Sequence, residues 1–366
     1  MEGFGEASSG LFGEALFPTF AAMLEYHLQS KNEGPATFHF AVAALRIIFM
    51  GTPEFAVASL DALVKAGCNI VGVVTAPDKP AGRGMKMNES AVKKYAVEKG
   101  LKVLQPEKLK SPEFLTELQS LQADLQIVVA FRMLPEAVWN MPPKGTINLH
   151  GSLLPQYRGA APINWAVING EKETGVTTFK LKHEIDTGDI LLQESFPIGE
   201  DDTAGEVHDR MKEIGAQLLV KTVKGIGEGT LEEKPQSSIV NLEISSSSSP
   251  DTHALKHAPK IFTETCKIDF TKTKEEVHNL IRGLSPFPGA FTYLNDKMLK
   301  IYRSKASPSP SKGGVLGSFI TDGKTYLRYV CTNGYIDVLE LQLEGKKKMM
   351  VDEFLRGYRV APPNLL

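Results

Sequence analysis

Two polar residues, Asn148 and His150, stand where the apolar run TINLH breaks into the turn GSLLP. Side chains on a β-strand alternate between its two faces, so both should project to one side while Leu149 points to the other. A carboxamide can donate a hydrogen bond to a carbonyl oxygen, and an imidazole can move a proton near neutral pH. The pair is a candidate acyl-transfer site, although a single histidine at a strand end is more often a hydrogen-bonded structural residue.

A carboxylate that sets the charge of the histidine would complete such a site, and Asp186 is our candidate. It lies in an Asp-Thr-Gly turn within HEIDTGDIL. Aspartate is also a common turn residue that binds its own backbone, so the turn alone leaves both interpretations open. We expect His183, Glu184 and Asp189 nearby to be solvated or structural.

Two other chemistries are disfavoured by the motifs. Ser152 lies two residues after His150, which invites a serine hydrolase interpretation, but no G-x-S-x-G elbow surrounds it. The segment FMGTPEF has one glycine where a dinucleotide fingerprint needs three, so the pyrophosphate cradle of a dehydrogenase is missing.

The elements that must position these residues alternate between apolar strands and amphipathic helices from Leu45 onward. This alternation predicts an α/β fold with a doubly wound, mostly parallel sheet. Such sheets bind ligands beyond the carboxyl ends of their strands. The expected strands are LRIIFMG, CNIVGVVTAP, LKVLQP, ADLQIVVAF and GTINLH.

The chain should divide into four parts. Residues 1–45 form an N-terminal extension of unknown purpose, and residues 46–232 form the α/β domain. Residues 233–262, which are polar and rich in Ser and Pro, are typical of an interdomain linker. Residues 263–366 begin with a helix and continue as short alternating strands, which predicts a small antiparallel barrel of OB-like type.

Composition narrows the function classes. No apolar run approaches the roughly 18 residues that span a bilayer, and the three cysteines form no metal-ligand spacing, so we expect neither a membrane span nor a metal. The acidic, arginine-free N-terminus argues against a transit peptide, and we expect a cytoplasmic protein that is a monomer by default. Residues 263–366 carry 16 Lys and Arg against 11 Asp and Glu, which suits either a polyanionic partner or a plain solvated surface.

Several motifs resemble the bacterial methionyl-tRNA formyltransferases, which belong to the enzymes that use 10-formyltetrahydrofolate. The resemblance covers roughly residues 46–366. Its central motifs are shared with other folate-dependent formyltransferases that act on small amines, whereas PAGRG and the C-terminal part narrow it to the tRNA enzymes. The motifs are MGTPEFAVASL, APDKPAGRGMKM, VVAFRMLP, NLHGSLLPQYRGAAPINWAVINGEKETGVT, HEIDTGDIL and LQLEGKKK.

The resemblance implies formyl transfer from 10-formyltetrahydrofolate to the methionine of initiator methionyl-tRNA, with Asn148, His150 and Asp186 as catalytic residues. A small-molecule amine is the alternative acceptor, and a noncatalytic RNA-binding protein is a third reading. Two segments would contact the folate. Their residues are Ser152, Leu153, Leu154 and Pro155 in the first, and Arg132, Met133 and Leu134 in the second.

Two basic clusters are candidates for contact with the tRNA backbone. Lys79, Arg83 and Lys86 lie on the Gly- and Pro-rich loop DKPAGRGMKMN, which could hold an acceptor end through its phosphates or could be a mobile surface loop. The run 346–348, which is Lys346, Lys347 and Lys348, is the second cluster, and lysine runs are commonly just solvated.

Overall fold

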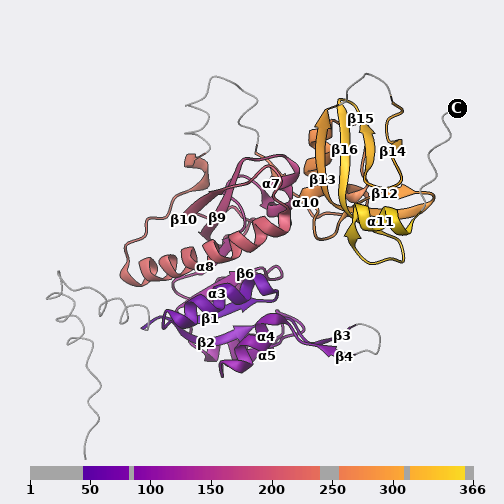
Figure 1. The fold of residues 1–366 in the computed structure, drawn as a ribbon. Coiled ribbons are helices and arrows are strands. Elements are labelled where there is room, and N and C mark those ends of the chain that lie inside the picture. Colours follow the sequence, from indigo (N-terminus) through magenta and orange to yellow (C-terminus); the bar gives the residue numbers. More distant parts are fainter. Residues whose placement is uncertain (1–43, 82–85, 240–254, 309–313, 359–366) are drawn as a thin grey trace, which may run out of the picture.

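The computed structural model describes residues 44–81, 86–239, 255–308 and 314–358, and it contains two large β-sheets from successive parts of the chain (Figure 1). The five strands from β7 to β5 in the first sheet are parallel, and β9 and β10 add antiparallel strands beside β7. The predicted mostly parallel sheet is therefore confirmed. Its order is β10 (Ile190–Pro197), β9 (Glu173–Lys180), β7 (Thr146–His150), β6 (Leu125–Val129), β1 (Arg46–Gly51), β2 (Asn69–Val74) and β5 (Val103–Leu104).

The central strands are apolar on both faces because helices cover both. In β1, Ile47 and Phe49 belong to one core, whereas Ile48 and Met50 belong to the other. This division follows the two-residue period of a strand. A sheet buried on both sides reads as a continuous apolar run, which is the pattern of the strands at the centre.

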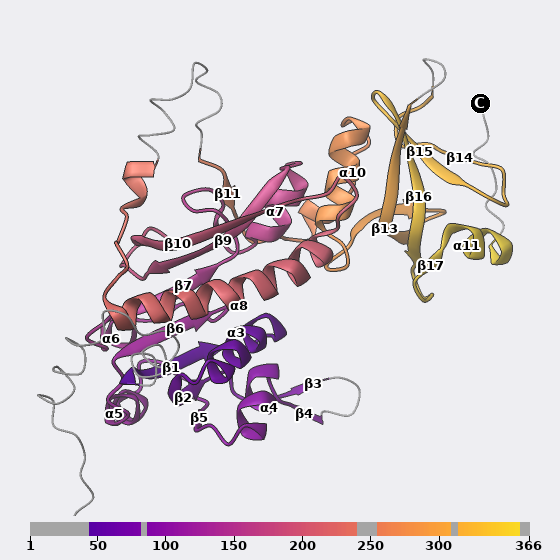
Figure 2. The ribbon, with the colours of Figure 1, turned by 60° about the vertical axis from the view of Figure 1, so that its left-hand side comes forward.

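Helices from several parts of the chain line these two cores. Residues of α3, α4, α7 and α8 pack in the core of Ile47, and residues of α5 and α6 pack in that of Ile48 (Figure 2). No helix in the described ranges combines the length and apolar character needed to cross a bilayer. The bounds are α3 (Glu54–Lys65), α4 (Ala91–Glu98), α5 (Pro112–Ser120), α6 (Glu136–Trp139), α7 (Pro162–Ile168) and α8 (Ala204–Glu228).

A two-stranded antiparallel ribbon projects from this domain (Figure 1). It consists of β3 (Lys79–Ala81) and β4 (Lys86–Asn88), where we had expected an irregular loop. Residues 82–85, which include the predicted contact residue Arg83, lie outside the described part of the chain.

The second large sheet is antiparallel and curled into a half-open barrel, as the strand pattern predicted. Its order is β12, β13, β16, β15 and β14, with β17 paired to β16. One core joins this sheet to helices α10 and α11. The bounds are α10 (Lys274–Gly283), β12 (Ala290–Leu294), β13 (Lys297–Pro308), β14 (Phe319–Thr321), β15 (Leu327–Cys331), β16 (Gly334–Leu343), β17 (Met349–Met350) and α11 (Val351–Gly357).

The two domains meet where α7 lies against α10 (Figures 1 and 2). Arg282 of α10 is 4% exposed, and its Nη1 donates to the carbonyl oxygens of Gly199 (3.2 Å) and Asp202 (3.1 Å). Arg303 forms an ion pair with Glu206 at 2.6 Å. The buried charged hydrogen bonds of Arg282 give the junction a defined geometry.

The described ends of the predicted linker are bound to the first domain. The segment β11 (His257–Ala258) pairs in parallel with β8 (Arg158–Gly159), and Trp165 donates from Nε1 to the carbonyl of Pro259 at 2.7 Å. Residues 240–254 lie outside the described part. The segment that leads to the second domain therefore packs beside the loop that follows His150.

Candidate active site

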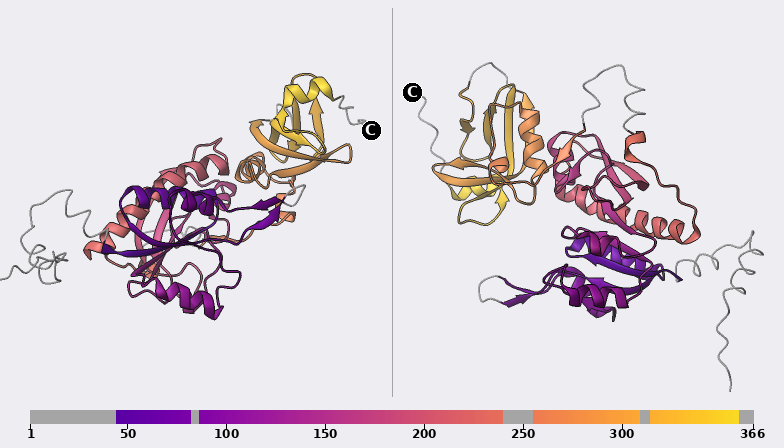
Figure 3. Two further views of the ribbon diagram at one scale, coloured as in Figure 1. Left: turned by 90° about the horizontal axis from the view of Figure 1, so that it is seen from below. Right: turned by 180° about the vertical axis from the view of Figure 1, so that it is seen from behind.

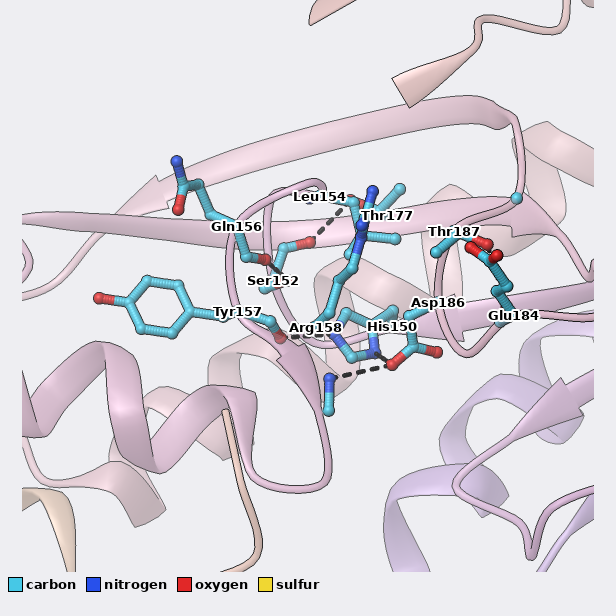
Figure 4. Close-up of polar contacts among 12 residues, drawn as sticks. His150, Ser152, Leu154, Gln156, Tyr157, Arg158, Thr177, Glu184, Asp186 and Thr187 are labelled. Atoms are coloured by element: carbon cyan, nitrogen blue, oxygen red, sulfur yellow. Dashed lines mark hydrogen bonds and ion pairs between the residues drawn. The ribbon is translucent and has the colours of Figure 1, made fainter. Parts of the chain in front are cut away.

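Asn148, His150 and Asp186 line one cavity of about 410 Å³ beyond the carboxyl end of β7. Asn148 and His150 come from alternate positions of the strand, and Leu149 between them packs into the core. Asp186 comes from the loop between β9 and β10 and faces His150 (Figure 4). The structure thus brings together the three residues that we predicted to be catalytic.

The imidazole of His150 is held by the backbone on one side and faces a carboxylate on the other. Its side chain is 7% exposed, and Nε2 lies 2.9 Å from the carbonyl oxygen of Tyr157. A carbonyl oxygen only accepts, so Nε2 carries the proton of this hydrogen bond. Nδ1 lies 3.9 Å from Oδ2 of Asp186, which is too long for a direct hydrogen bond. Nδ1 is therefore the ring nitrogen left free to accept a proton, and it faces the carboxylate of Asp186.

Asp186 is fixed by contacts from both its backbone and its side chain. Its φ is 55°, in the left-handed region that costs a non-glycine residue energy. Oδ2 accepts from the backbone N–H of Gly159 at 3.0 Å, and the carbonyl oxygen of Asp186 accepts from Nε2 of Gln236 at 2.8 Å. These contacts aim the carboxylate at the imidazole.

Gln236 is a positioning residue that the sequence did not reveal. It is 3% exposed, and besides Asp186 its Nε2 also donates to the carbonyl of Gly188 at 2.8 Å. Its Oε1 accepts from Nε (3.0 Å) and Nη2 (2.5 Å) of Arg158. Both carbonyls lie about 50 residues before Gln236 in the chain. The residues around Gln236 therefore carry no local pattern that could predict these contacts.

The amide of Asn148 is uncommitted. Asn148 is half-buried at the wall of the cavity, and within the described part of the chain its side chain makes no hydrogen bond. Its backbone is fixed between Val128 of β6 and Phe179 of β9. A rigidly placed donor without a partner is suited to an oxygen of a bound substrate.

The residues of the SLLP segment support the loop from within the fold. The buried hydroxyl of Ser152 donates to the carbonyl of Gln156 at 2.7 Å, and the backbone N–H of Leu154 donates to Oγ1 of Thr177 at 3.1 Å (Figure 4). The cavity lining includes Gly151 but not Ser152, Leu153, Leu154 or Pro155. The hydroxyl of Ser152 is thus engaged away from His150, which gives a serine nucleophile no support. The folate contact of these four residues stays a prediction.

The segment after β6 reaches the cavity through Ala130 and Phe131, just before the three predicted folate residues. Arg132 turns to residues 106–107, where Nη1 donates to the carbonyl of Glu107 at 2.9 Å. Met133 is 75% exposed, and Leu134 packs against the core beneath. Contact of Arg132, Met133 and Leu134 with folate also stays a prediction.

The described basic candidates lie on the ribbon of β3 and β4 and between β16 and β17. Lys79 is exposed on β3. Lys86 begins β4, and its backbone pairs with that of Ala81 at the end of β3. Lys346 and Lys347 are exposed, and Nζ of Lys347 lies 3.8 Å from Oε1 of Glu353. Nζ of Lys348 lies 3.1 Å from Oε1 of Glu340 and over the ring of Tyr302. The ribbon and the second domain project on the same side of the first domain (Figures 1 and 3).

Comparison with known proteins agrees with this geometry. The family model described as formyl transferase matches residues 45–223, and the model for the C-terminal domain of formyl transferase matches residues 260–359. The methionyl-tRNA formyltransferase of Bacteroides fragilis is 51% identical over 321 residues, which cover 86% of this chain and 96% of the relative. The methionyl-tRNA formyltransferase of Phocaeicola vulgatus is 53% identical over 326 residues, which cover 87% of this chain and 98% of the relative.

Solved structures show the same fold at lower identity. The sugar 3N-formyl transferase WlaRD, crystallised with dTDP and 5-N-formyl-THF, has a TM-score of 0.59 at 21% identity and covers 83% of this chain and 99% of its own. HypX from Aquifex aeolicus in complex with tetrahydrofolic acid has a TM-score of 0.56 at 17% identity. The match covers 87% of this chain and 49% of HypX. On the family models and the relatives of about 50% identity, the chain belongs to the formyl transferase family and, within it, to the methionyl-tRNA formyltransferases.

Proposed function

We propose that this chain transfers the formyl group of 10-formyltetrahydrofolate to the α-amino group of methionine on initiator methionyl-tRNA, and so supports the start of translation. The observation that carries the proposal is the single cavity at which the free amide of Asn148 and the facing pair of His150 and Asp186 meet. It occurs in a chain that belongs to the methionyl-tRNA formyltransferases.

Asn148 stabilises the developing oxyanion. As the amine nitrogen bonds to the formyl carbon, negative charge builds on the formyl oxygen, and a donor already aimed there needs no reorganisation. The side-chain amide of Asn148 has no competing partner in the described structure, so it is free to donate. Such a donor typically contributes about 2.7–4 kcal/mol to the transition state.

His150 and Asp186 manage the proton. The amine loses a proton as its bond to the formyl carbon forms, and the nitrogen of the leaving group gains one as its bond breaks. Nδ1 of His150 is the ring atom open to this exchange because Nε2 is bound to Tyr157. At 3.9 Å, the carboxylate of Asp186 is close enough to act on the ring through charge, directly or through a water molecule. The protonated ring also adds a positive charge beside the oxyanion.

The cavity suits a formyl donor of folate type. Its volume of about 410 Å³ falls in the usual range for small-molecule sites. Its lining combines apolar groups, among them Val128, Ala130 and Phe131, with the three polar candidates. The segments 131–134 and 152–155 are the parts of the chain that we assign to holding the folate. Within the described ranges no group of three or more His, Cys, Asp or Glu could hold a metal ion.

The tRNA would lie across the basic surfaces of both domains. The ribbon that carries Lys79 and Lys86 and the half-barrel that carries 346–348 face the same side of the molecule (Figure 3). Lysines bind phosphate through charge without reading sequence, which fits contacts that position an acceptor arm. Because Glu353 and Glu340 lie beside Lys347 and Lys348, binding there must compete with existing ion pairs.

A small-molecule amine is the alternative acceptor, and it is less well supported than methionyl-tRNA. The structural neighbours that act on sugars are only about 21–22% identical, so they show the fold alone. One assay separates the two: the protein is incubated with 10-formyltetrahydrofolate and either methionyl-tRNA, free methionine or an amino sugar nucleotide. We expect formylation of the charged tRNA only. Formylation of the sugar amine without that of the tRNA would reject the proposal.

The remaining features follow from this function. We assign the domains as 46–232 and 263–366, joined by 233–262 and preceded by the extension 1–45. An enzyme of translation initiation works where ribosomes are, so we place it in the cytoplasm. Neither catalysis nor the proposed tRNA surface needs a second subunit, so we propose a monomer, which sedimentation at micromolar concentration can check.

A further inference from the structure

The carbonyl oxygen that binds the imidazole of His150 belongs to Tyr157, a residue in a strained conformation. Nε2 of His150 lies 2.9 Å from this oxygen. The φ of Tyr157 is 59°, in the left-handed region that bulky side chains rarely adopt. A residue keeps such a conformation only when the surrounding structure holds it there. The contacts of Tyr157 therefore decide where the hydrogen-bond acceptor of His150 lies.

The side chain of Tyr157 points away from His150 and ends among polar groups (Figure 4). Its hydroxyl donates to the carboxylate of Glu171 and accepts from Nδ2 of Asn169 at 3.1 Å. Nζ of Lys256 lies 2.5 Å from Oε1 of Glu171. Burial, and after it the contact with Glu171, raises the pKa of the Tyr157 phenol, so the hydroxyl keeps its proton and donates. We call Tyr157, Asn169, Glu171 and Lys256 the tyrosine cluster.

The tyrosine cluster joins the loop after His150 to the segment that leads into the second domain. The backbone N–H of Tyr157 donates to the carbonyl of Lys256 at 2.6 Å, and the side chain of Lys256 pairs with Glu171. Lys256 thus holds Tyr157 twice, once through the backbone and once through Glu171. The four residues lie outside the lining of the catalytic cavity, so they can act on the reaction only through the groups that they hold.

We propose that Tyr157, Glu171 and Lys256 are positioning residues that hold the Tyr157 carbonyl against Nε2 of His150 and so keep the proton of the neutral imidazole on that nitrogen. A neutral imidazole carries one ring proton, and the hydrogen bond of one nitrogen sets which nitrogen bears it. With the proton on Nε2, Nδ1 is left to accept the proton of the attacking amine. The proposal rests on the function given above and adds the residues that keep His150 in its reactive tautomer.

Matched variants separate the contacts of the tyrosine cluster. Tyr157→Phe removes only the hydroxyl and Glu171→Ala removes its acceptor, so both should release the strained backbone to the same degree. Glu171→Gln keeps an acceptor for the hydroxyl and should restore most of what Glu171→Ala loses. Tyr95→Phe is the control, because its hydroxyl donates to Asp61 at 3.0 Å and Asp61 pairs with Lys65 at 2.6 Å. This is the same chemistry on α3 and α4, outside the lining of the catalytic cavity.

Nuclear magnetic resonance of the full chain with isotope-labelled histidine reports the tautomer directly, since proton–nitrogen correlations show which ring nitrogen carries the proton. The chain has eight histidines, and the signals of His150 are those lost in His150→Asn. At mildly alkaline pH, where imidazoles are neutral, we expect the proton on Nε2 in the wild type and in Tyr95→Phe. Tyr157→Phe and Glu171→Ala should show a mixture of both tautomers. Protonation of Nε2 alone in all of these variants would overturn the proposal.

Steady-state formylation provides the second measurement. We expect kcat of Tyr157→Phe and Glu171→Ala to fall roughly 3- to 10-fold, as for one hydrogen bond, with KM for both substrates within twofold of wild type. Lys256→Met should lose less, since the carbonyl at this position still accepts from Tyr157. A raised KM for methionyl-tRNA with unchanged kcat would place the tyrosine cluster in substrate binding and would also overturn the proposal. Failure of the wild type to formylate methionyl-tRNA would reject the proposed function, while the tautomer measurement would still decide the role of the cluster.

Discussion

Asn148 and His150 are positioned by a strand in the middle of a seven-stranded sheet, whereas Asp186 is positioned by a loop whose contacts come from distant parts of the chain. β7 is hydrogen bonded on both sides, to β6 and to β9, so the directions of its side chains follow from its register. The loop of Asp186 depends on Gln236 and on the backbone N–H of Gly159. The strand should therefore tolerate change around it, while the loop should not.

The second difference between the two regions lies in their link to the rest of the molecule. The segment that supplies Tyr157 and Gly159 is paired to 257–258, which leads into the second domain. Tyr157 also donates its backbone N–H to the carbonyl of Lys256 at 2.6 Å. A movement of the second domain can thus alter the positions of both His150 and Asp186 through the loop of residues 157–159. Asn148 makes no contact with this loop through the hydrogen bonds described above.

The largest expected effect is on the strand side, at the proposed oxyanion donor. Asn148→Ala removes a donor that acts in the transition state, so kcat should fall roughly 100- to 1,000-fold. The half-buried side chain makes no hydrogen bond in the described structure, so its loss should leave the melting temperature nearly unchanged. Single-turnover formylation of methionyl-tRNA measures the first quantity and calorimetry the second. Turnover close to wild type would remove Asn148 from the mechanism.

On the loop side, Asp186→Asn keeps the shape but removes the charge. Two unit charges about 4 Å apart attract each other by about 1 kcal/mol in water and about 4 kcal/mol near a protein surface, so kcat should fall about 10- to 100-fold. The profile of rate against pH should also change, because a charged group is removed from beside the imidazole. An unchanged profile would show that Asp186 serves only its turn, where its Oδ2 accepts from Gly159.

The same contrast explains how far the sequence alone could lead. The convergence of Asn148 and His150 was predictable because it depends on the local two-residue period of one strand. The ribbon of β3 and β4 was missed because Gly and Pro predict turns but do not show where short strands pair again. Pairing of 257–258 with 158–159 was missed for a related reason: contacts between segments about 100 residues apart leave no local pattern.

A smaller loss of activity is expected when the hydrogen bonds that hold the loop of Asp186 are removed at Gln236. Gln236→Ala removes the hydrogen bonds to the carbonyls of Asp186 and Gly188, each worth about 1 kcal/mol, as well as those from Arg158. Without them Asp186 can leave its strained conformation, so kcat should fall about 10-fold with little change in KM. The profile of rate against pH should change as it does in Asp186→Asn. Both are measured by steady-state formylation across pH.

Two matched variants separate the roles of the Gln236 amide. Gln236→Glu keeps an acceptor for Arg158 but cannot donate to the two carbonyls, so it should behave as Gln236→Ala. Arg158→Ala leaves both donations in place and should cost less activity. If Gln236→Glu were fully active, the contacts to Asp186 and Gly188 would have no positioning role.

The smallest expected effect lies outside the catalytic cavity, in the ion pair of Glu206 with Arg303 at the domain junction. Burial would raise the pKa of Glu206, but hydrogen bonds from Thr203 and Arg303 outweigh it and lower that pKa to about 2. A carboxylate whose pKa is lower in the folded state stabilises the fold above its ordinary pKa near 4.5 and loses this contribution as the pH falls toward 2. Because the pair is partly exposed, Arg303→Ala should lower the free energy of unfolding by less than about 1 kcal/mol at pH 7.

Urea unfolding of wild type and Arg303→Ala between pH 7 and pH 3 checks this expectation. The difference between them should be constant down to about pH 4.5 and shrink below it, because protonation of Glu206 removes its charge interaction with Arg303. Formylation by Arg303→Ala at saturating substrate should equal that of wild type, since Arg282 still fixes the junction through Gly199 and Asp202. A large loss of kcat would instead mean that a change at the domain junction alters the position of Asp186 through the segment 257–258. The loop of Asp186 would then depend on the second domain, whereas the strand of Asn148 would not.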